Sequence, residues 1–150
     1  MPRPTRRRSA APSVRRSRVL PAAPTTVWRH LLGANWLGFD EGGPTPGDRV
    51  RLRDPFGGDG PRDAAIRGVR AGEELRLEWW PTGRPDDRSE VTISLRPHEA
   101  GTRVTVLEQA VPGDLSLRAK AWTSCLQALA GALDHTRSSA AQVPFARSVL

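Results

Sequence analysis

The sequence has little of several features that often guide a functional interpretation. Its only cysteine is Cys125, so no disulfide can form within the chain, and a reducing compartment is compatible with it. Its apolar runs are short and are interrupted by Pro21 and Pro24. It therefore lacks both the apolar core of a signal peptide and a stretch of about 18 apolar residues that could cross a bilayer. We expect a cytoplasmic protein without a membrane span.

Acidic residues are missing from the first part of the chain. Seven arginines lie before Val19, while the first acidic residue is Asp40. The formal net charge of +7 comes from this segment, because 16 basic and 16 acidic residues remain from Val19 onward. The segment also has few apolar residues to bury, so we expect residues 1–12 to be disordered. We predict one domain over residues 13–137 and a flexible tail over residues 138–150.

This charge distribution argues against a domain that recognises nucleic acid. An arginine-rich tail can hold phosphates weakly and in a salt-dependent manner. Reading of bases requires a structured element that presents side chains to a groove, and the sequence shows no such element. We therefore predict weak contact with polyanions through the N-terminal tail and no specific nucleic-acid partner.

Between Gly47 and Glu108, apolar residues alternate with charged and other polar residues in five segments. This two-residue period is typical of strands with one buried and one solvated face. Turn-forming stretches such as DPFGGDGPR and PTGRPDDRS separate the segments, which indicates successive hairpins. With a first strand over Val14 to Leu20, they predict an antiparallel sheet of about six or seven strands. The residues expected on its buried face are Val50, Leu52, Ala64, Ile66, Gly68, Leu75, Leu77, Trp79, Val91, Ile93, Leu95, Val104 and Val106.

Two segments outside the strands have helical spacing. After the first strand, Pro24 suits the first position of a helix, and Val27, Trp28 and Leu31 follow at helical intervals. Near the end of the chain, Leu115 to Leu133 carries an apolar stripe along a much longer segment. The order of strand, short helices, many strands and long helix favours an α+β fold in which the sheet curls around the terminal helix. The space between the sheet and this helix is a candidate pocket.

Six strings of the sequence resemble a known family when they are taken in order. The strings are VLPAAPTTVWRHL, LRDPFGG, LRLEWWP, SEVTISL, GTRVTVLE and AWTSCLQAL. They are similar to small bacterial members of the activator-of-heat-shock-protein-90-ATPase homologue family, within the START-like or SRPBCC superfamily. The resemblance covers the chain from about Ser13 to His135. It implies the helix-grip fold, a curved antiparallel sheet wrapped around a long C-terminal helix, with two short helices after the first strand.

The resemblance leaves several functions open, because relatives bind lipids, sterols or polyketides, some are cyclases or hydrolase-like, and the eukaryotic namesake stimulates a chaperone ATPase. Our first hypothesis is binding of a small apolar molecule in the cavity between the sheet and the terminal helix. The second is a protein-interaction or co-chaperone-like domain that contacts an ATPase or another partner. The third is a cyclase- or hydrolase-like enzyme that shapes and desolvates its substrate. A cavity of about 300 Å³ or more would favour the first or third hypothesis, and a filled core the second.

The candidate cavity is lined by residues that the strand and helix patterns turn inward. Aromatic residues at such spacing are also usual components of a core, so both interpretations stay open for the tryptophans. Trp80 alternates outward and, with Trp36, is a candidate cover for the mouth of the cavity. The predicted ligand-binding residues are Trp28, Trp36, Leu52, Ile66, Leu77, Trp79, Val91, Ile93, Val104, Val106, Glu108, Trp122, Leu126 and Leu129.

Glu108 is the only charged member of this set. The strand period turns it inward, toward Trp122, and a buried carboxylate is costly unless it is paired or touches a ligand or water. One hypothesis is that Glu108 anchors a polar group of the ligand. The alternative is that it pairs with an arginine and has a structural role.

The sequence shows neither a catalytic constellation nor a metal site. The three histidines fall on a short helix, a hairpin turn and a helix end, so none is an evident partner for Cys125, which we expect to be buried and unreactive. The histidines also lack metal-ligand spacing, and DPFGGDG lacks the Lys and Ser/Thr of a phosphate loop. We therefore predict no catalytic residues, no metal and no cofactor. The oligomeric state is not predicted.

Overall fold

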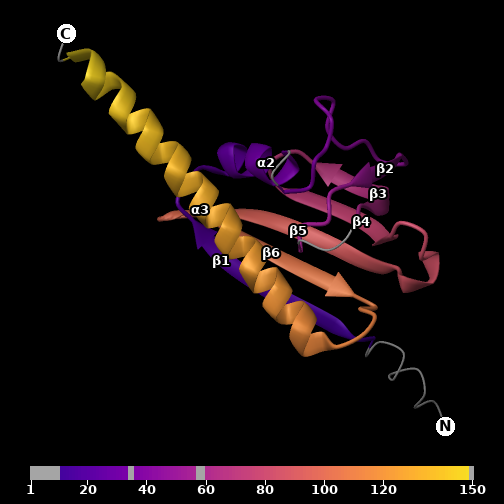
Figure 1. The fold of residues 1–150 in the computed structure, drawn as a ribbon. Coiled ribbons are helices and arrows are strands. Elements are labelled where there is room, and N and C mark those ends of the chain that lie inside the picture. Colours follow the sequence, from indigo (N-terminus) through magenta and orange to yellow (C-terminus); the bar gives the residue numbers. More distant parts are fainter. Residues whose placement is uncertain (1–10, 34–35, 57–59, 149–150) are drawn as a thin grey trace.

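The alternating segments form the strands of a single antiparallel sheet, on which one long helix packs (Figure 1). This computed structural model describes residues 11–33, 36–56 and 60–148. The strands lie in the order β1-β6-β5-β4-β3-β2, and every neighbouring pair is antiparallel. Their bounds are β1 Ser13–Leu20, β2 Arg49–Leu52, β3 Arg62–Arg70, β4 Glu74–Pro81, β5 Ser89–His98 and β6 Gly101–Gln109. The α+β class and the antiparallel sheet are thus confirmed, with six strands.

The cross-strand register gathers the inward residues into rows under the long helix. In one row, Val91 pairs with Leu77 of β4 and with Glu108 of β6. The neighbouring row contains Ser89 and Trp79, which also pair directly. Because side chains alternate between the two faces, these rows place Glu108, Ser89 and Trp79 on the same side of the sheet.

The predicted inward position of Gly68 is wrong. A bulge between Ile66 and Gly68 shifts the register of β3, so that Gly68 pairs with Arg76 and Val69 pairs with Leu75. Val69 packs against the core, whereas a Cβ on Gly68 would meet the guanidinium of Arg76 at 2.8 Å. The extra residue of a bulge reverses the alternation beyond it.

Two α-helices and one short 3₁₀ helix complete the described elements. Helix α2, Pro24–Leu32, begins with its proline and buries Val27, Trp28 and Leu31. The 3₁₀ helix η1 spans Pro85–Asp87 between β4 and β5. Helix α3, Leu115–Ser148, begins after Asp114, whose Oδ1 accepts hydrogen bonds from the backbone N–H groups of residues 116 and 117 at 2.8 and 3.2 Å. This arrangement is a side-chain N-cap.

The second short helix implied by the resemblance does not occur among the described residues. The chain between α2 and β2 turns repeatedly instead, with positive φ angles of 76°, 71° and 93° at Gly38, Gly43 and Gly47. Pro44 and Pro46 lie in the same stretch. Left-handed glycines and closely spaced prolines are incompatible with a continuous helix, which explains the single short helix.

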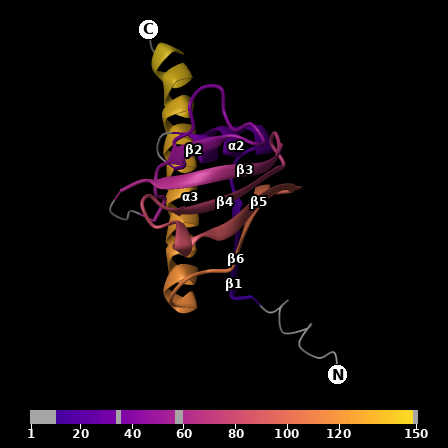
Figure 2. The same ribbon diagram turned by 90° about the vertical axis from the view of Figure 1, so that its right-hand side faces the viewer.

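Helix α3 lies on one face of the sheet, and its last turns extend past the sheet (Figure 1). In the part of the chain that is described, the opposite face of the sheet carries no helix (Figure 2). Its buried residues fall on one stripe, as the sequence predicted. None of the described helices is long and apolar enough to cross a membrane. The N-terminal tail falls almost entirely outside the described residues, so the domain boundaries near residues 12 and 137 stay predictions. The buried residues of α3 within the described side chains, up to Asp134, are Ala119, Trp122, Cys125, Leu126, Leu129, Ala130 and Leu133.

Candidate functional site

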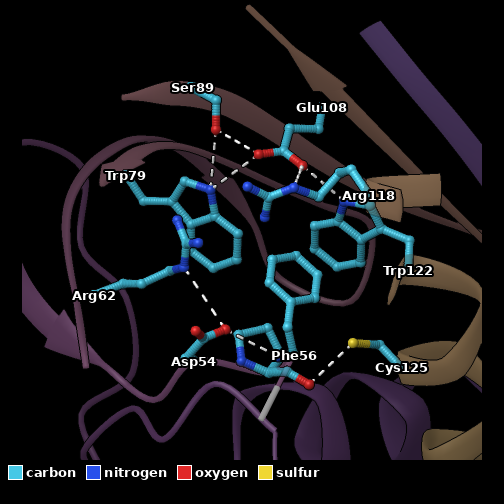
Figure 3. Close-up of polar contacts among 10 residues, drawn as sticks. Asp54, Phe56, Arg62, Trp79, Ser89, Glu108, Arg118, Trp122 and Cys125 are labelled. Carbon is cyan, nitrogen blue, oxygen red and sulfur yellow. Dashed lines mark hydrogen bonds and ion pairs between the residues drawn. The ribbon is translucent and has the colours of Figure 1, made fainter. Parts of the chain in front are cut away.

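Aromatic side chains fill the space between the sheet and the first half of α3. Trp79 of β4 and Trp122 of α3 are stacked, with ring centroids 6.0 Å apart and an interplanar angle of 12°. Phe56, from the β2–β3 connection, meets both rings edge-on at 5.8 and 4.8 Å (Figure 3). Trp36 lies 6.2 Å from Trp122 and donates its Nε1–H to the carbonyl of Cys125. These four rings occupy the region in which the sequence suggested a cavity.

Glu108 contacts Trp79 and Trp122 of this aromatic cluster through its carboxylate and has no exposed surface. Its Oε1 accepts a hydrogen bond from Trp122 Nε1 at 2.8 Å and lies 3.6 Å from Arg118 Nε. Its Oε2 accepts hydrogen bonds from Ser89 Oγ at 2.5 Å and Trp79 Nε1 at 3.4 Å (Figure 3). Both oxygens are therefore engaged by side chains from β4, β5 and α3, as a buried carboxylate requires.

Two arginines contact the aromatic cluster, Arg62 and Arg118. The guanidinium of Arg62 lies 4.6 Å from the centroid of the Trp79 ring, and that of Arg118 lies 4.6 Å from the centroid of Phe56. Their side chains are only 8% and 14% exposed. Burial lowers the pKa of the Arg62 guanidinium; the charge of Asp54 opposes this shift and that of Arg118 adds to it. Both arginines remain cations, because guanidinium does not lose its proton in proteins.

A cleft of about 620 Å³ opens where these arginines reach the surface. An adjoining hollow of about 350 Å³ shares Asp54, Arg62, Pro112 and Arg118 with it, so the two are parts of one groove, which we call the arginine groove. The cleft is further lined by Gly60, Pro61, Pro81, Arg84, Asp87 and Gly113, and the hollow by Phe56, Asp114, Leu117 and Ala121. The groove thus has a charged half and a half with apolar side chains.

Cys125 is not prepared for nucleophilic chemistry. Its thiol is buried and donates to the carbonyl of Pro55 at 3.0 Å. Burial raises the pKa of the Cys125 thiol to about 12, with a further increase from Asp54 and an opposing effect from Arg118. A thiol with such a pKa has almost no nucleophilic thiolate near neutral pH. Among the described residues, no group of three or more His, Cys, Asp and Glu could hold a metal ion.

The sequence-predicted ligand-binding residues all lie in the interior. Thirteen of them belong to one apolar core cluster, and Glu108 is the buried carboxylate beside it. None of them lines the arginine groove. Trp36 and Leu129 border a separate hollow of about 230 Å³ between α2 and α3. Trp80 points outward as predicted, where the guanidinium groups of Arg49 and Arg88 cover its ring at 5.5 and 4.7 Å.

Sequence reasoning missed the two arginines, although the signals for them were present. Arg62 precedes Ala64 and Ile66 at the strand period, so it belongs to the same inward face. Arg118 lies four residues before Trp122 and therefore begins the stripe that continues along α3. Phe56 had no such signal, because it lies in an irregular connection between β2 and β3.

Comparisons with known proteins agree with this architecture. The model of the family described as Activator of Hsp90 ATPase homolog 1-like protein matches residues 21–134. A search of curated proteins found no match.

Solved structures share the fold at low sequence identity. DynU16, a protein in the dynemicin biosynthetic locus, has 23% identity and a TM-score of 0.70 over 81% of this chain; the chain covers 47% of DynU16, about half its length. MLL2253 from Mesorhizobium loti has 22% identity and a TM-score of 0.66, with 83% of this chain and 98% of that protein covered. The Aha1 dimer from Colwellia psychrerythraea has 17% identity and a TM-score of 0.66, with coverage of 81% and 96%. At these identities the similarity describes the fold.

Proposed function

This chain belongs to the family of Activator of Hsp90 ATPase homolog 1-like proteins, and we propose that within this fold it is a small-molecule-binding domain whose ligand occupies the arginine groove. The observation that carries the proposal is the junction of two hollows, of about 620 and 350 Å³, through four shared residues. Ligand sites typically enclose about 300 to 1,000 Å³ and combine apolar walls with a few polar groups. The arginine groove falls in this size range; six of its fourteen lining residues are charged, and Phe56, Leu117 and Ala121 supply its apolar wall.

The apolar half of the groove supports the binding of an apolar ligand portion. Leu117 is 65% exposed and lines the hollow together with Phe56 and Ala121. A single exposed leucine is common, but here it continues an apolar wall that begins at the aromatic cluster. A ligand covering this wall would remove apolar surface from water, which stabilises the complex by about 25 cal/mol per Å².

The position of the groove differs from the cavity that the sequence suggested. The interior site would require space among Trp79, Trp122 and Phe56, whose rings are in contact. The groove instead lies at the end of this aromatic cluster, where the β2–β3 connection approaches the start of α3. A ligand can enter there without displacing the core.

Titration with N-phenyl-1-naphthylamine, a neutral apolar dye whose emission rises in apolar surroundings, tests the proposal. We expect saturable binding of one dye per chain and energy transfer from Trp79 and Trp122, which contact Phe56. Leu117→Gln should weaken dye binding about threefold or more, because it removes apolar contact area from the hollow.

Leu115→Gln is the matched control for this experiment. Leu115 is also an exposed leucine in the first turn of α3, at 39% exposure, but it does not line the hollow. Its substitution should leave dye affinity within about twofold of the original value. Failure of the dye to saturate, or equal effects of Leu115→Gln and Leu117→Gln, would refute binding in the groove.

The filled space between the sheet and α3 favours the alternative function, a protein-interaction domain, but the arginine-rich outer face of the sheet that such a domain would use is partly neutralised. Arg67 and Arg88 both contact Glu78, at 2.8 and 3.3 Å, and Arg51 contacts Asp63 at 2.9 Å. The carboxylates of the same face thus neutralise many of its cations. An acidic partner would have to compete with these ion pairs, so we favour the small-molecule ligand.

A further inference from the structure

We propose that the ligand of the arginine groove is an amphipathic organic anion, whose carboxylate or other oxyanion head group is held by Arg62 and Arg118 while its apolar part lies against Phe56 and Leu117. This inference rests on the proposed function, because it names the chemical class of the ligand in the same groove. It is carried by one buried hydrogen-bond donor without an acceptor among the described residues, Arg62 Nε, and by a second guanidinium that lines the same groove.

The unpartnered donor is the Nε–H group of Arg62. The residue is only 6% exposed, yet its Nε has no hydrogen-bond partner in the described part of the chain. Asp54 Oδ1 lies 3.7 Å from this Nε, an ion-pair distance that is too long for a hydrogen bond. A buried donor without an acceptor costs about 1 to 3 kcal/mol. Because this Nε has almost no exposed surface, a ligand would remove the penalty by a small shift of the Arg62 side chain toward the groove.

Arg118 presents a second set of donors to the same groove. Its Nε lies 3.6 Å from Glu108 Oε1, again beyond hydrogen-bond distance. A guanidinium carries five N–H donors in a planar fork that matches a carboxylate or phosphate. Arg62 and Arg118 line both halves of the groove, so their donors lie at the boundary between its charged and apolar parts.

The acidic groups near these arginines are already engaged. Both oxygens of Glu108 accept hydrogen bonds from buried side chains, and Asp54 Oδ1 accepts one from the backbone N–H of Phe56 at 2.9 Å. The third arginine of the cleft, Arg84, forms two hydrogen bonds with Asp87 at 2.9 and 2.6 Å. Arg62 and Arg118 thus have their carboxylate partners, Asp54 and Glu108, only at ion-pair distances of 3.7 and 3.6 Å, while these carboxylates accept hydrogen bonds from other groups.

The two cations also repel one another. The charge of Arg118 contributes to the lowered pKa of Arg62. The two positive charges therefore repel one another, and because both side chains are mostly buried, water screens this repulsion only in part. An oxyanion close to both would offset the repulsion and accept charge-assisted hydrogen bonds. The adjoining wall of Phe56, Leu117 and Ala121 would cover the apolar part of the same molecule.

Displacement of bound N-phenyl-1-naphthylamine by decanoate and by decanol tests the inference. The two competitors share one alkyl chain and differ in the carboxylate, so their ratio of affinities measures recognition of the anion. We expect decanoate to bind about tenfold more tightly than decanol. Arg62→Gln and Arg118→Gln should each reduce this preference to about threefold or less.

Arg103→Gln is the control for general loss of positive charge, because Arg103 is exposed on the outer face of β6 and should not affect the preference. If Arg118→Gln lowers stability by leaving Glu108 without a cation, the double variant Arg118→Gln, Glu108→Gln removes both charges and should still lose the preference. Equal displacement of the dye by decanoate and decanol would overturn the inference. It would also be overturned if both the double variant and Arg62→Gln kept the preference for decanoate over decanol. In both cases saturable dye binding would leave the proposed function intact, whereas absent dye binding would reject the function itself.

Discussion

Replacing Glu108 by glutamine separates a structural role of this carboxylate from a role in ligand binding. Glutamine keeps the shape and one acceptor oxygen, but it removes the negative charge that lies 3.6 Å from Arg118 Nε. Ser89 and Trp122 donate to different oxygens of Glu108, so glutamine keeps one of these bonds in neutral form and turns its NH2 toward the other donor, which together costs about 2 kcal/mol. Loss of a partner for Arg118 adds to this cost, although the 14% exposure of the arginine side chain limits it. We expect a total loss of about 3 kcal/mol, at the lower end of the range for breaking a buried ion pair.

Urea unfolding followed by tryptophan emission and circular dichroism measures this loss. With an m value of about 2 kcal/mol per molar urea, the midpoint should fall by about 1.5 M while m stays constant. Glu90→Gln makes the same chemical change at an exposed position of β5 and should alter the free energy of unfolding by less than about 0.5 kcal/mol. The reasoning would be refuted if Glu108→Gln matched this control in stability but changed dye affinity, because Glu108 would then act on the ligand.

Three further predictions address the core, the thiol and the N-terminal tail. Phe56→Ala should lower the free energy of unfolding by about 2 to 3 kcal/mol, because it leaves a cavity beside Trp79 and Trp122, and it should weaken dye binding, because Phe56 is part of the apolar wall of the groove; an unchanged dye affinity would contradict this. Cys125, whose thiol pKa is raised to about 12 by burial, should react with a disulfide reagent at pH 8 only when urea unfolds the chain, and rapid labelling of the folded protein would show that the thiol is accessible. Removal of residues 1–11 should shift Tm by less than about 2 °C, because β1 and the bond from Val111 N–H to the Pro12 carbonyl remain; a larger shift would show that the segment contributes to the fold.

The sequence determined the architecture because local patterns report burial directly. The two-residue period from Val50 to Val106 identified the buried face of the sheet, with one error at Gly68, where a bulge reversed the alternation. The stripe of Trp122, Leu126 and Leu129 likewise identified the face of α3 that packs on the sheet. Burial of Glu108 also followed from its position in the strand period.

Only the tertiary structure decided what surrounds these residues. Phe56 lies in an irregular connection, where no period indicates the direction of a side chain, yet its ring contacts both Trp79 and Trp122 and fills the expected cavity. The arginine groove likewise joins Arg62 of β3 to Arg118 of α3, which are far apart in the chain. Periodicity reports whether a residue is buried, because solvent exposure repeats with the geometry of its own helix or strand. Which buried groups meet, and whether they leave room for a ligand, depends on how separate elements and their connecting loops pack, and no local pattern encodes that packing.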